Sequence, residues 1–308
     1  MKTPWWFLRK SPMAFMLVPA SWVYNLVSRA VYHMRAIGAY TPRRPVVCIG
    51  NIFAGGVGKT PVVSQLAKYL NAPVVMRGYK KSAQTNNIGD EAAMLADMGL
   101  QVHTGHRKSN VMLLDRQDDN TPIVMDDGYQ NPTVRKSVSV LVFDSVLGFG
   151  NGFILPAGPL RQGKRTVANA DAILVVKSGK VRKNFMLPAD VPVFYARPRT
   201  VNPYSRGTKI FAFAGIGYPK KFFDSIGGNV VGTRAFADHH DYTDADLARL
   251  FKLAARRGAK LLTTQKDWMR LPADAQREIK FAPLEMDIDC EFFDWIKEKT
   301  NAYVKARG

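Results

Sequence analysis

The stretch Gly50–Pro61, with the sequence GNIFAGGVGKTP, constrains the fold more than any other part of this chain. It follows the apolar run Pro45–Ile49 and opens the helix-compatible segment Thr60–Leu70. A strand, a glycine-rich turn and a helix in this order form phosphate-binding loops, because backbone N–H groups and the helix N-terminus both face the phosphate oxygens. The sequence therefore predicts a mostly parallel α/β sheet with a nucleoside triphosphate bound at this turn.

The side chains of the turn add to this prediction. Lys59 is expected to reach the β- and γ-phosphates of ATP, and Thr60 to ligate Mg²⁺. The strict motif has glycine where this chain has Phe53, and a related group of membrane-positioning and electron-transfer ATPases has a signature lysine where this chain has Ala54. A plain strand-to-helix connection is the alternative. The predicted ATP-binding residues are Gly55, Gly56, Val57, Gly58, Lys59 and Thr60.

Positive charge is concentrated in the first part of the chain. The 308 residues carry a net charge of +19, and residues 1–89 contain twelve Lys and Arg but no Asp or Glu. A field of one sign indicates a polyanionic partner, which can be a nucleic acid, an anionic bilayer or a phosphorylated substrate. The two cysteines, Cys48 and Cys290, have no metal-binding spacing and indicate reduced thiols in the cytosol.

Residues 5–32 combine tryptophan and other aromatic side chains with flanking basic ones. Pro12 and Pro19 interrupt the segment, and it lacks the roughly 20 mainly apolar residues of a spanning helix. Its composition favours a helix that lies in the headgroup layer of a membrane. A helix packed on the protein's own core and a transmembrane anchor are the two alternatives.

Two acidic motifs follow the phosphate loop. The apolar run Pro122–Met125 ends in Asp126 and Asp127, and a carboxylate at this end of a parallel strand is placed to hold Mg²⁺ beside the loop. Asp126 is the stronger metal candidate, with Asp127 as a helper, although Asp-Gly is also a common turn. Asp90 stands at the head of an expected helix, where it can equally be an N-cap.

The rest of the chain predicts a second α/β series. Asn151–Arg161 reads as a functional loop in which Arg161 offers a fixed charge to a phosphate, and residues 197–208 read as a linker. A new strand and helix series begins at Lys209–Gly217, with the exposed loop Asp238–Asp241 (DHHD) inside it. We therefore predict a membrane-associating segment (1–40), a phosphate-loop kinase core (41–204) and a smaller α/β domain (205–308).

Several motifs occur in the order found in one known family. They are GNIFAGGVGKTP, RGY (77–79), GDE (89–91), DDGYQ (126–130), LPAGPLR (155–161), FAGIGYPKKFF (213–223), FADHH (236–240) and LTTQKD (262–267). Over about residues 45–270 the chain closely resembles the tetraacyldisaccharide 4′-kinases of lipid A biosynthesis. The resemblance implies transfer of the γ-phosphate of MgATP to the 4′-hydroxyl of a tetraacylated glucosamine disaccharide 1-phosphate. It also implies a site at the cytoplasmic face of the inner membrane. We further predict a monomer without a nucleic acid partner.

The same resemblance assigns roles to individual residues. Asp90 corresponds to the catalytic carboxylate and His239 to its partner, while Asp126 and Asp127 match the Mg²⁺-associated pair. The expected substrate-binding residues are Arg77, Tyr79 and Arg161. The chain departs from the family at Lys80–Ile88, which is short, and at Met76, where serine is usual.

Two other functions compete with the kinase. A membrane-associated ATPase switch that binds partner proteins would transfer phosphate only to water, and Ala54 in place of the signature lysine opposes it. A nucleic-acid-binding protein would use the basic face and stack bases on tryptophan. The segment Leu262–Asp267 is also loosely similar to the base-reading loops of nucleotide enzymes.

Overall fold

The computed structural model describes residues 4–78, 89–117, 119–183, 185–238 and 240–307, with the Asp90 side chain excepted. The chain forms two compact units. Among the described residues, the larger unit contains 4–78, 95–117, 119–183, 185–197 and 286–307, and the smaller one contains 89–94, 198–238 and 240–285. The three-part division expected from the sequence stays a prediction.

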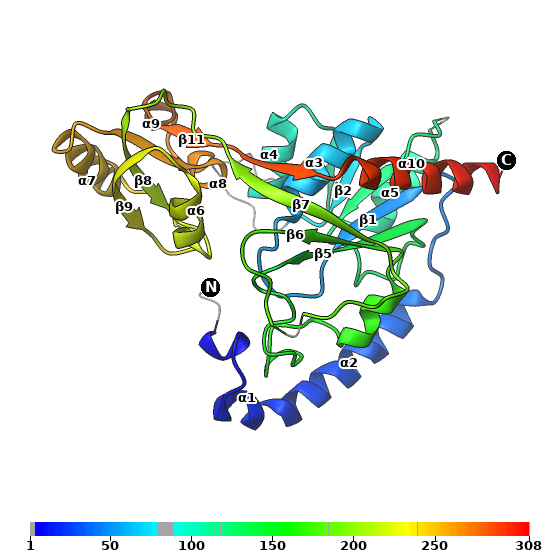
Figure 1. Cartoon of the computed structure of the whole chain (residues 1–308). Coiled ribbons are helices and arrows are strands. Elements are labelled where there is room, and N and C mark those ends of the chain that lie inside the picture. The colour runs from blue at the N-terminus through cyan, green and yellow to red at the C-terminus, as the bar shows by residue number, and fades with distance from the viewer. Residues whose placement is uncertain (1–3, 79–88, 118, 184, 239, 308) are drawn as a thin grey trace. The chain divides into compact units, whose positions relative to one another are not determined.

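An eight-stranded sheet is the framework of the larger unit (Figure 1). The described pairings from β7 through β6, β5, β1, β4 and β2 to β3 are all parallel. In spatial order the strands are β12 (Leu284–Ile288), β7 (Val193–Thr200), β6 (Ala172–Val176), β5 (Val138–Asp144), β1 (Val46–Gly50), β4 (Ile123–Asp126), β2 (Val74–Met76) and β3 (Val102–Thr104).

The central strands are buried on both faces. Every residue of β1, β4, β5 and β6 is buried, as expected of unbroken Val, Ile and Leu runs in a parallel sheet. Each large aliphatic side chain buried in this way contributes about 1.5–3 kcal/mol to folding. Helices pack against the sheet, and the predicted mostly parallel sheet flanked by helices is thereby confirmed.

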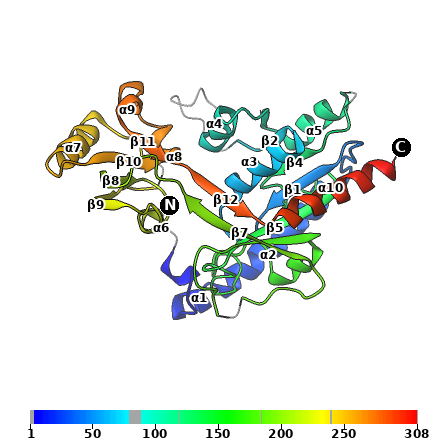
Figure 2. The ribbon, with the colours of Figure 1, turned by 45° about the horizontal axis from the view of Figure 1, so that its top comes forward.

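Two helices of the larger unit pack near the glycine-rich turn Gly50–Pro61. The helix α3 follows the loop and packs on β1 and β4, and α10 packs on α3, β1 and β5. Figures 1 and 2 show α3 and α10 side by side. The described helices of this unit are η1 (Trp5–Phe7), α1 (Pro12–Met16), α2 (Val18–Ala36), α3 (Lys59–Leu70), α5 (Arg107–Asp115), η3 (Lys164–Asn169) and α10 (Cys290–Lys305), and α4 (Asp90–Asp97) is divided between the units.

The smaller unit is built on its own parallel sheet. Its four strands follow the order β11 (Lys280–Ala282), β10 (Lys260–Thr264), β8 (Lys209–Ala214) and β9 (Asn229–Ala235). The helices are α6 (Pro219–Ser225), α7 (Asp244–Ala255), α8 (Gln265–Trp268) and α9 (Ala273–Glu278). Phe213 and Leu250 are fully buried between β8 and α7, and this second α/β core confirms the predicted smaller domain fold.

The helix α2 turns its polar side toward the protein. Ser21 is its buried residue, and the Ser21 hydroxyl donates to the Ile154 carbonyl and accepts from the Ala157 N–H. The apolar side chains point outward, with Trp22 70% and Leu26 71% exposed. Among the described residues, no helix combines the length and the apolar character needed to cross a membrane.

A buried polar cluster fixes the chain just before β1. The Asp115 carboxylate accepts the Tyr40 hydroxyl at 2.5 Å and the backbone N–H groups of Arg43 and Arg44 at 3.0 and 2.8 Å. The Arg44 side chain, 2% exposed, donates to the carbonyls of Leu114 and Thr121. This cluster ties the end of α5 to the start of the strand that carries the glycine-rich turn.

The end of β7 differs from the sequence expectation. The predicted linker 197–208 is wrong in its first part, because β7 continues to Thr200. Pairing with a neighbouring strand overrides the proline and the charged residues there, as is common near a sheet edge.

Candidate active site

The glycine-rich turn leaves β1 and enters α3 through a left-handed residue. Gly58 has a φ of +84°, and an added Cβ there would lie 2.8 Å from the Met286 methyl carbon. Gly50 is equally constrained, because a Cβ would approach the Tyr129 Cβ to 2.5 Å. Both positions therefore require glycine.

Four backbone N–H groups of the turn have no hydrogen-bond acceptor among the described residues. In the described parts of the chain, those of Gly55, Gly56, Val57 and Gly58 donate to no protein oxygen. Gly55 and Gly56 are also exposed. Successive N–H groups without internal partners at a helix N-terminus form an anion-binding concavity. The turn therefore has the donor arrangement that a polyphosphate requires.

Lys59 lies at the centre of a polar cluster. Its ammonium donates to the Asn51 side-chain oxygen at 3.0 Å and pairs with the Asp127 carboxylate at 3.1 Å. Asn51 is fully buried, and its amide nitrogen donates to the carbonyl of Phe53 at 2.7 Å. The Lys59 ammonium is thus held over the turn between an amide and a carboxylate.

Asp127 has an unusual backbone that points its carboxylate at Lys59. Its φ is +51°, and its N–H donates to the Ile49 carbonyl at 2.8 Å, which fixes it at the end of β1. Arg161 pairs with the same carboxylate at 2.9 Å. Burial alone would raise the pKa of Asp127, but the charges of Lys59 and Arg161 outweigh it and hold this pKa below its ordinary value.

Asp126 ends β4 directly beside β1. It is opposite Ile49 in the parallel register and 5% exposed. Arg107, the first residue of α5, donates to the carbonyls of both Asp126 and Asp127 at 3.0 and 3.1 Å. These two hydrogen bonds fix the backbone of the acidic pair.

The oxygen donors around the turn suit Mg²⁺. The ion prefers carboxylate and hydroxyl oxygens and usually takes only one or two carboxylates, with phosphate and water completing its shell. Asp126 and Asp127 could offer carboxylates to such an ion, and Thr60 could offer a hydroxyl from the first turn of α3. Among the described residues, there is no group of three or more His, Cys, Asp and Glu side chains that could hold a metal ion.

Three residues of the site were missed by sequence reasoning. Asn51 and Arg107 are described above, and Gln130 donates from its side-chain nitrogen to the Asn51 carbonyl at 2.7 Å. Asn51 lies inside the glycine-rich motif, so the motif itself could have predicted that Asn51 contacts Lys59. Arg107 gave no signal, because its contact depends on how α5 is placed along the sheet.

The other predicted site residues are placed only in part. Tyr79 and His239 lie outside the described residues, and of Asp90 only the backbone, at the start of α4, is described. Arg77 follows β2 and is exposed. The neighbouring His240 stacks on Phe236 and pairs with Asp246 at 3.0 Å, which gives it a structural role at the start of α7.

The base-reading interpretation of Leu262–Asp267 is wrong. Asp267 is fully buried, accepts the Gly215 N–H at 3.0 Å and accepts the Thr264 hydroxyl at 2.7 Å. This buried carboxylate connects β8 to α8, and none of its surface is exposed to contact a nucleotide base.

Comparisons with known proteins agree on one family. The family described as tetraacyldisaccharide-1-P 4'-kinase matches residues 13–301. A tetraacyldisaccharide 4'-kinase of Hyphomonas neptunium is 39% identical over 78% of this chain and 77% of its own length, and one of Methylobacterium nodulans is 38% identical over 88% and 87%. A solved structure of LpxK from Aquifex aeolicus in complex with ATP covers 95% of this chain and 99% of its own, at 21% identity and a TM-score of 0.73.

Proposed function

The chain belongs to the tetraacyldisaccharide-1-P 4'-kinase family, which confirms the resemblance seen in its motifs, and we propose that it phosphorylates a lipid A precursor. The reaction moves the γ-phosphate of ATP to the 4′-hydroxyl of a tetraacylated glucosamine disaccharide 1-phosphate. The observation that carries this proposal is the Lys59–Asp127 pair beside a turn whose four N–H groups have no acceptor among the described residues.

The residues of the site divide the work of phosphoryl transfer. The N–H groups of Gly55 to Gly58 hold the phosphates, and Lys59 neutralises charge on the β- and γ-phosphates. Mg²⁺ held by Thr60, Asp126 and Asp127 would supply further neutralisation of the triphosphate. Arg161 keeps Asp127 in place and brings a second positive charge to the transferred group.

The acceptor side of the reaction needs a group that orients the sugar hydroxyl. In the proposal the 4′-oxygen forms a bond to the γ-phosphorus, and the bond from that phosphorus to the bridging oxygen of ADP breaks. Asp90 takes the hydroxyl proton, and His239 tunes the Asp90 carboxylate. Arg77 and Tyr79 bind the anionic lipid, in keeping with their place within the acid-free first part of the chain, residues 1–89.

We also propose that α1 and α2 bind the surface of an anionic membrane. The outward apolar side chains of α2 include Trp22, Leu26 and Met34, and the exposed Arg29 and Arg35 stand among them. Aromatic and aliphatic groups enter the headgroup boundary while arginine pairs with lipid phosphate. Such binding at the cytoplasmic face of the inner membrane brings the kinase to an acyl-chain substrate and to ATP.

The test follows the fate of the γ-phosphate. Purified protein is incubated with γ-labelled ATP, Mg²⁺ and the disaccharide lipid in mixed micelles, and label in lipid is compared with label in inorganic phosphate. The kinase proposal predicts that label accumulates in the lipid at a rate well above the rate of hydrolysis. Label found only in inorganic phosphate would identify the ATPase switch and refute the kinase.

A further inference from the structure

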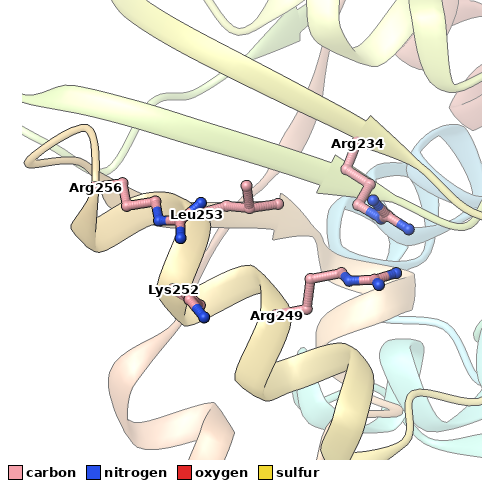
Figure 3. Close-up of a pocket in the computed structure, with 5 residues that line it drawn as sticks. All are labelled: Arg234, Arg249, Lys252, Leu253 and Arg256. Atoms are coloured by element: carbon pink, nitrogen blue, oxygen red, sulfur yellow. The ribbon is translucent and has the colours of Figure 1, made fainter.

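The smaller unit contains a cationic pocket between β9 and α7. It is lined by Arg234, Arg249, Lys252, Leu253 and Arg256 and has a volume of about 290 Å³ (Figure 3). Four of its five lining residues carry a positive charge. We propose that this pocket binds the phosphate group of an anionic ligand, as a second anion site that uses no residue of the phosphate loop or the acidic pair.

The helix α7 separates its apolar and basic sides. Leu247, Leu250 and Ala254 pack in the core, while Arg249, Lys252 and Arg256 recur at intervals of three and four residues on the outer side. Residues at this spacing share one face of a helix. The sequence of α7 thus places three cations in one row.

The strand β9 contributes the fourth cation from a different element. The Arg234 guanidinium lies 5.4 Å from the centre of the Phe236 ring, which helps to fix its direction. Figure 3 shows the guanidinium groups of Arg234 and Arg249 extending to the same side. Two planar guanidinium groups around one cavity match the geometry in which arginine binds phosphate oxygens.

No carboxylate of the described residues forms an ion pair with the four cations of the pocket. In the part of the chain that the structure describes, none of Arg234, Arg249, Lys252 and Arg256 forms an ion pair. Asp246, the nearest acid of α7 in sequence to Arg249, is engaged by Thr243 and His240. Like charges gathered without a counter-charge repel one another, and an anion with two negative charges removes that cost.

Helix capping explains only part of the cluster. Lys252 and Arg256 stand in or after the last turn of α7, where cations interact favourably with the helix dipole. Arg249 lies in the middle of the helix and Arg234 lies on a strand, so the dipole does not account for them. An anionic ligand in the pocket would account for Arg234 and Arg249, whose guanidinium groups extend to the same side in Figure 3. The phosphate can belong to a soluble compound or to a lipid headgroup.

Protection of arginine from phenylglyoxal tests the pocket directly. The full-length protein is first saturated with Mg²⁺ and a non-hydrolysable ATP analogue, so that the phosphate loop is filled. Inorganic phosphate or vesicles are then added, and modification of each arginine is followed by peptide mass spectrometry. We expect the modification rates of Arg234, Arg249 and Arg256 to fall at least about fivefold, while that of the exposed Arg206 is unchanged.

The two sources of phosphate are separated by the added probe. Protection by inorganic phosphate identifies a soluble ligand. Protection only by phosphatidylcholine vesicles that contain phosphatidylglycerol, and not by phosphatidylcholine alone, identifies a headgroup. Protection by neither probe overturns the proposal. This readout does not depend on kinase activity, so the proposal and the proposed function can fail separately.

Two variants that lose the same number of positive charges distinguish binding in the pocket from attraction by the net charge of the protein. Arg249→Gln with Arg256→Gln removes two exposed cations of the pocket, and Lys297→Gln with Lys305→Gln removes two exposed cations of α10. The pocket variant should lose the protection of Arg234, and the α10 variant should keep it. Equal loss in both variants would mean that the net charge of the protein, rather than the pocket, attracts the anion.

Discussion

The ammonium of Lys59 lies 3.1 Å from the carboxylate of Asp127, although the two residues come from different strand ends. The sheet explains their meeting, because Lys59 follows β1, Asp127 follows β4, and these strands are parallel neighbours. The glycine-rich turn and the acidic motif are therefore one site. In the proposed function, this pair provides a cation for the phosphates and a carboxylate for Mg²⁺.

Asp127→Asn should separate catalysis from nucleotide binding. Loss of the carboxylate removes the proposed Mg²⁺ ligand and the partner of Lys59 and Arg161, and we expect kcat to fall by about 100-fold. The same change removes a negative charge beside the triphosphate, so the Kd for ATP should stay the same or decrease. Steady-state kinetics and an ATP titration measure the two effects. A weaker affinity for ATP at unchanged kcat would show that Asp127 acts only in binding.

Asp115→Asn should destabilise the larger unit. Asparagine cannot accept the Tyr40 hydroxyl and both backbone N–H groups as the carboxylate does, and we expect a loss of about 2–4 kcal/mol in the free energy of unfolding. Chemical denaturation at pH 7 measures it. Asp274→Asn, at a side chain that is 95% exposed, is the control and should change little.

The destabilisation caused by Asp115→Asn should become smaller as the pH falls. Burial works to raise the pKa of Asp115, but the Arg44 N–H, the Tyr40 hydroxyl and the Arg43 N–H together hold it below the ordinary value of 3.8. A folded pKa below the unfolded one means that the stabilisation is complete above about pH 4 and is lost as the pH falls through the folded pKa. The difference in the free energy of unfolding between wild type and Asp115→Asn should therefore be constant from about pH 5 to 8 and become smaller in stronger acid. A difference that grows in acid would contradict this account.

The two thiols should react at very different rates. Cys48 is fully buried in β1, and burial raises its pKa to about 11, whereas Cys290 is exposed at the start of α10. Because the thiolate is the reactive form, native protein should show one fast thiol toward Ellman's reagent, and unfolded protein should show two. Cys290→Ser should remove the fast reaction. A fast thiol that survives in Cys290→Ser would mean that β1 opens readily.

The outward apolar side of α2 should determine membrane binding. Replacing Trp22 and Leu26 with serine removes exposed apolar area, and we expect flotation with vesicles containing phosphatidylglycerol to fall at least about fivefold. Binding of ATP should be unaffected. Serine at Leu113 and Met186, which are 54% and 81% exposed elsewhere, is the matched control. An equal decrease in flotation for the two variants would mean that any exposed apolar side chain of the protein contributes to membrane binding, and not the outward side of α2 in particular.

The parts of the fold that follow local rules could be predicted from the sequence. Buried strands such as β1 and β4 are unbroken apolar runs, and the motif at Gly50–Pro61 carries its own geometry in its glycines. Contacts that depend on the arrangement of whole elements could not be predicted. Arg107 reaches the acidic pair only because α5 starts at the edge of the site, and no pattern in its own neighbourhood indicates this.

The inward polar side of α2 illustrates the same limit. The composition of residues 5–32 indicates a helix at an apolar boundary, but it does not say which side meets the protein. The Ser21 hydroxyl decides this through the backbone of the loop at Ile154 and Ala157. A polar contact between residues that are far apart in the sequence thereby turns Trp22 and Leu26 outward.

The position of the transferred phosphate tests the central claim most directly. The protein is given γ-labelled ATP with either the disaccharide lipid or its 4′-deoxy analogue, and the labelled lipid is located by mass spectrometry. We predict one labelled phosphate at the 4′-position of the natural acceptor, none on the 4′-deoxy analogue, and none on either lipid with Lys59→Ala. Label on the 4′-deoxy lipid, or undiminished transfer by Lys59→Ala, would contradict the account.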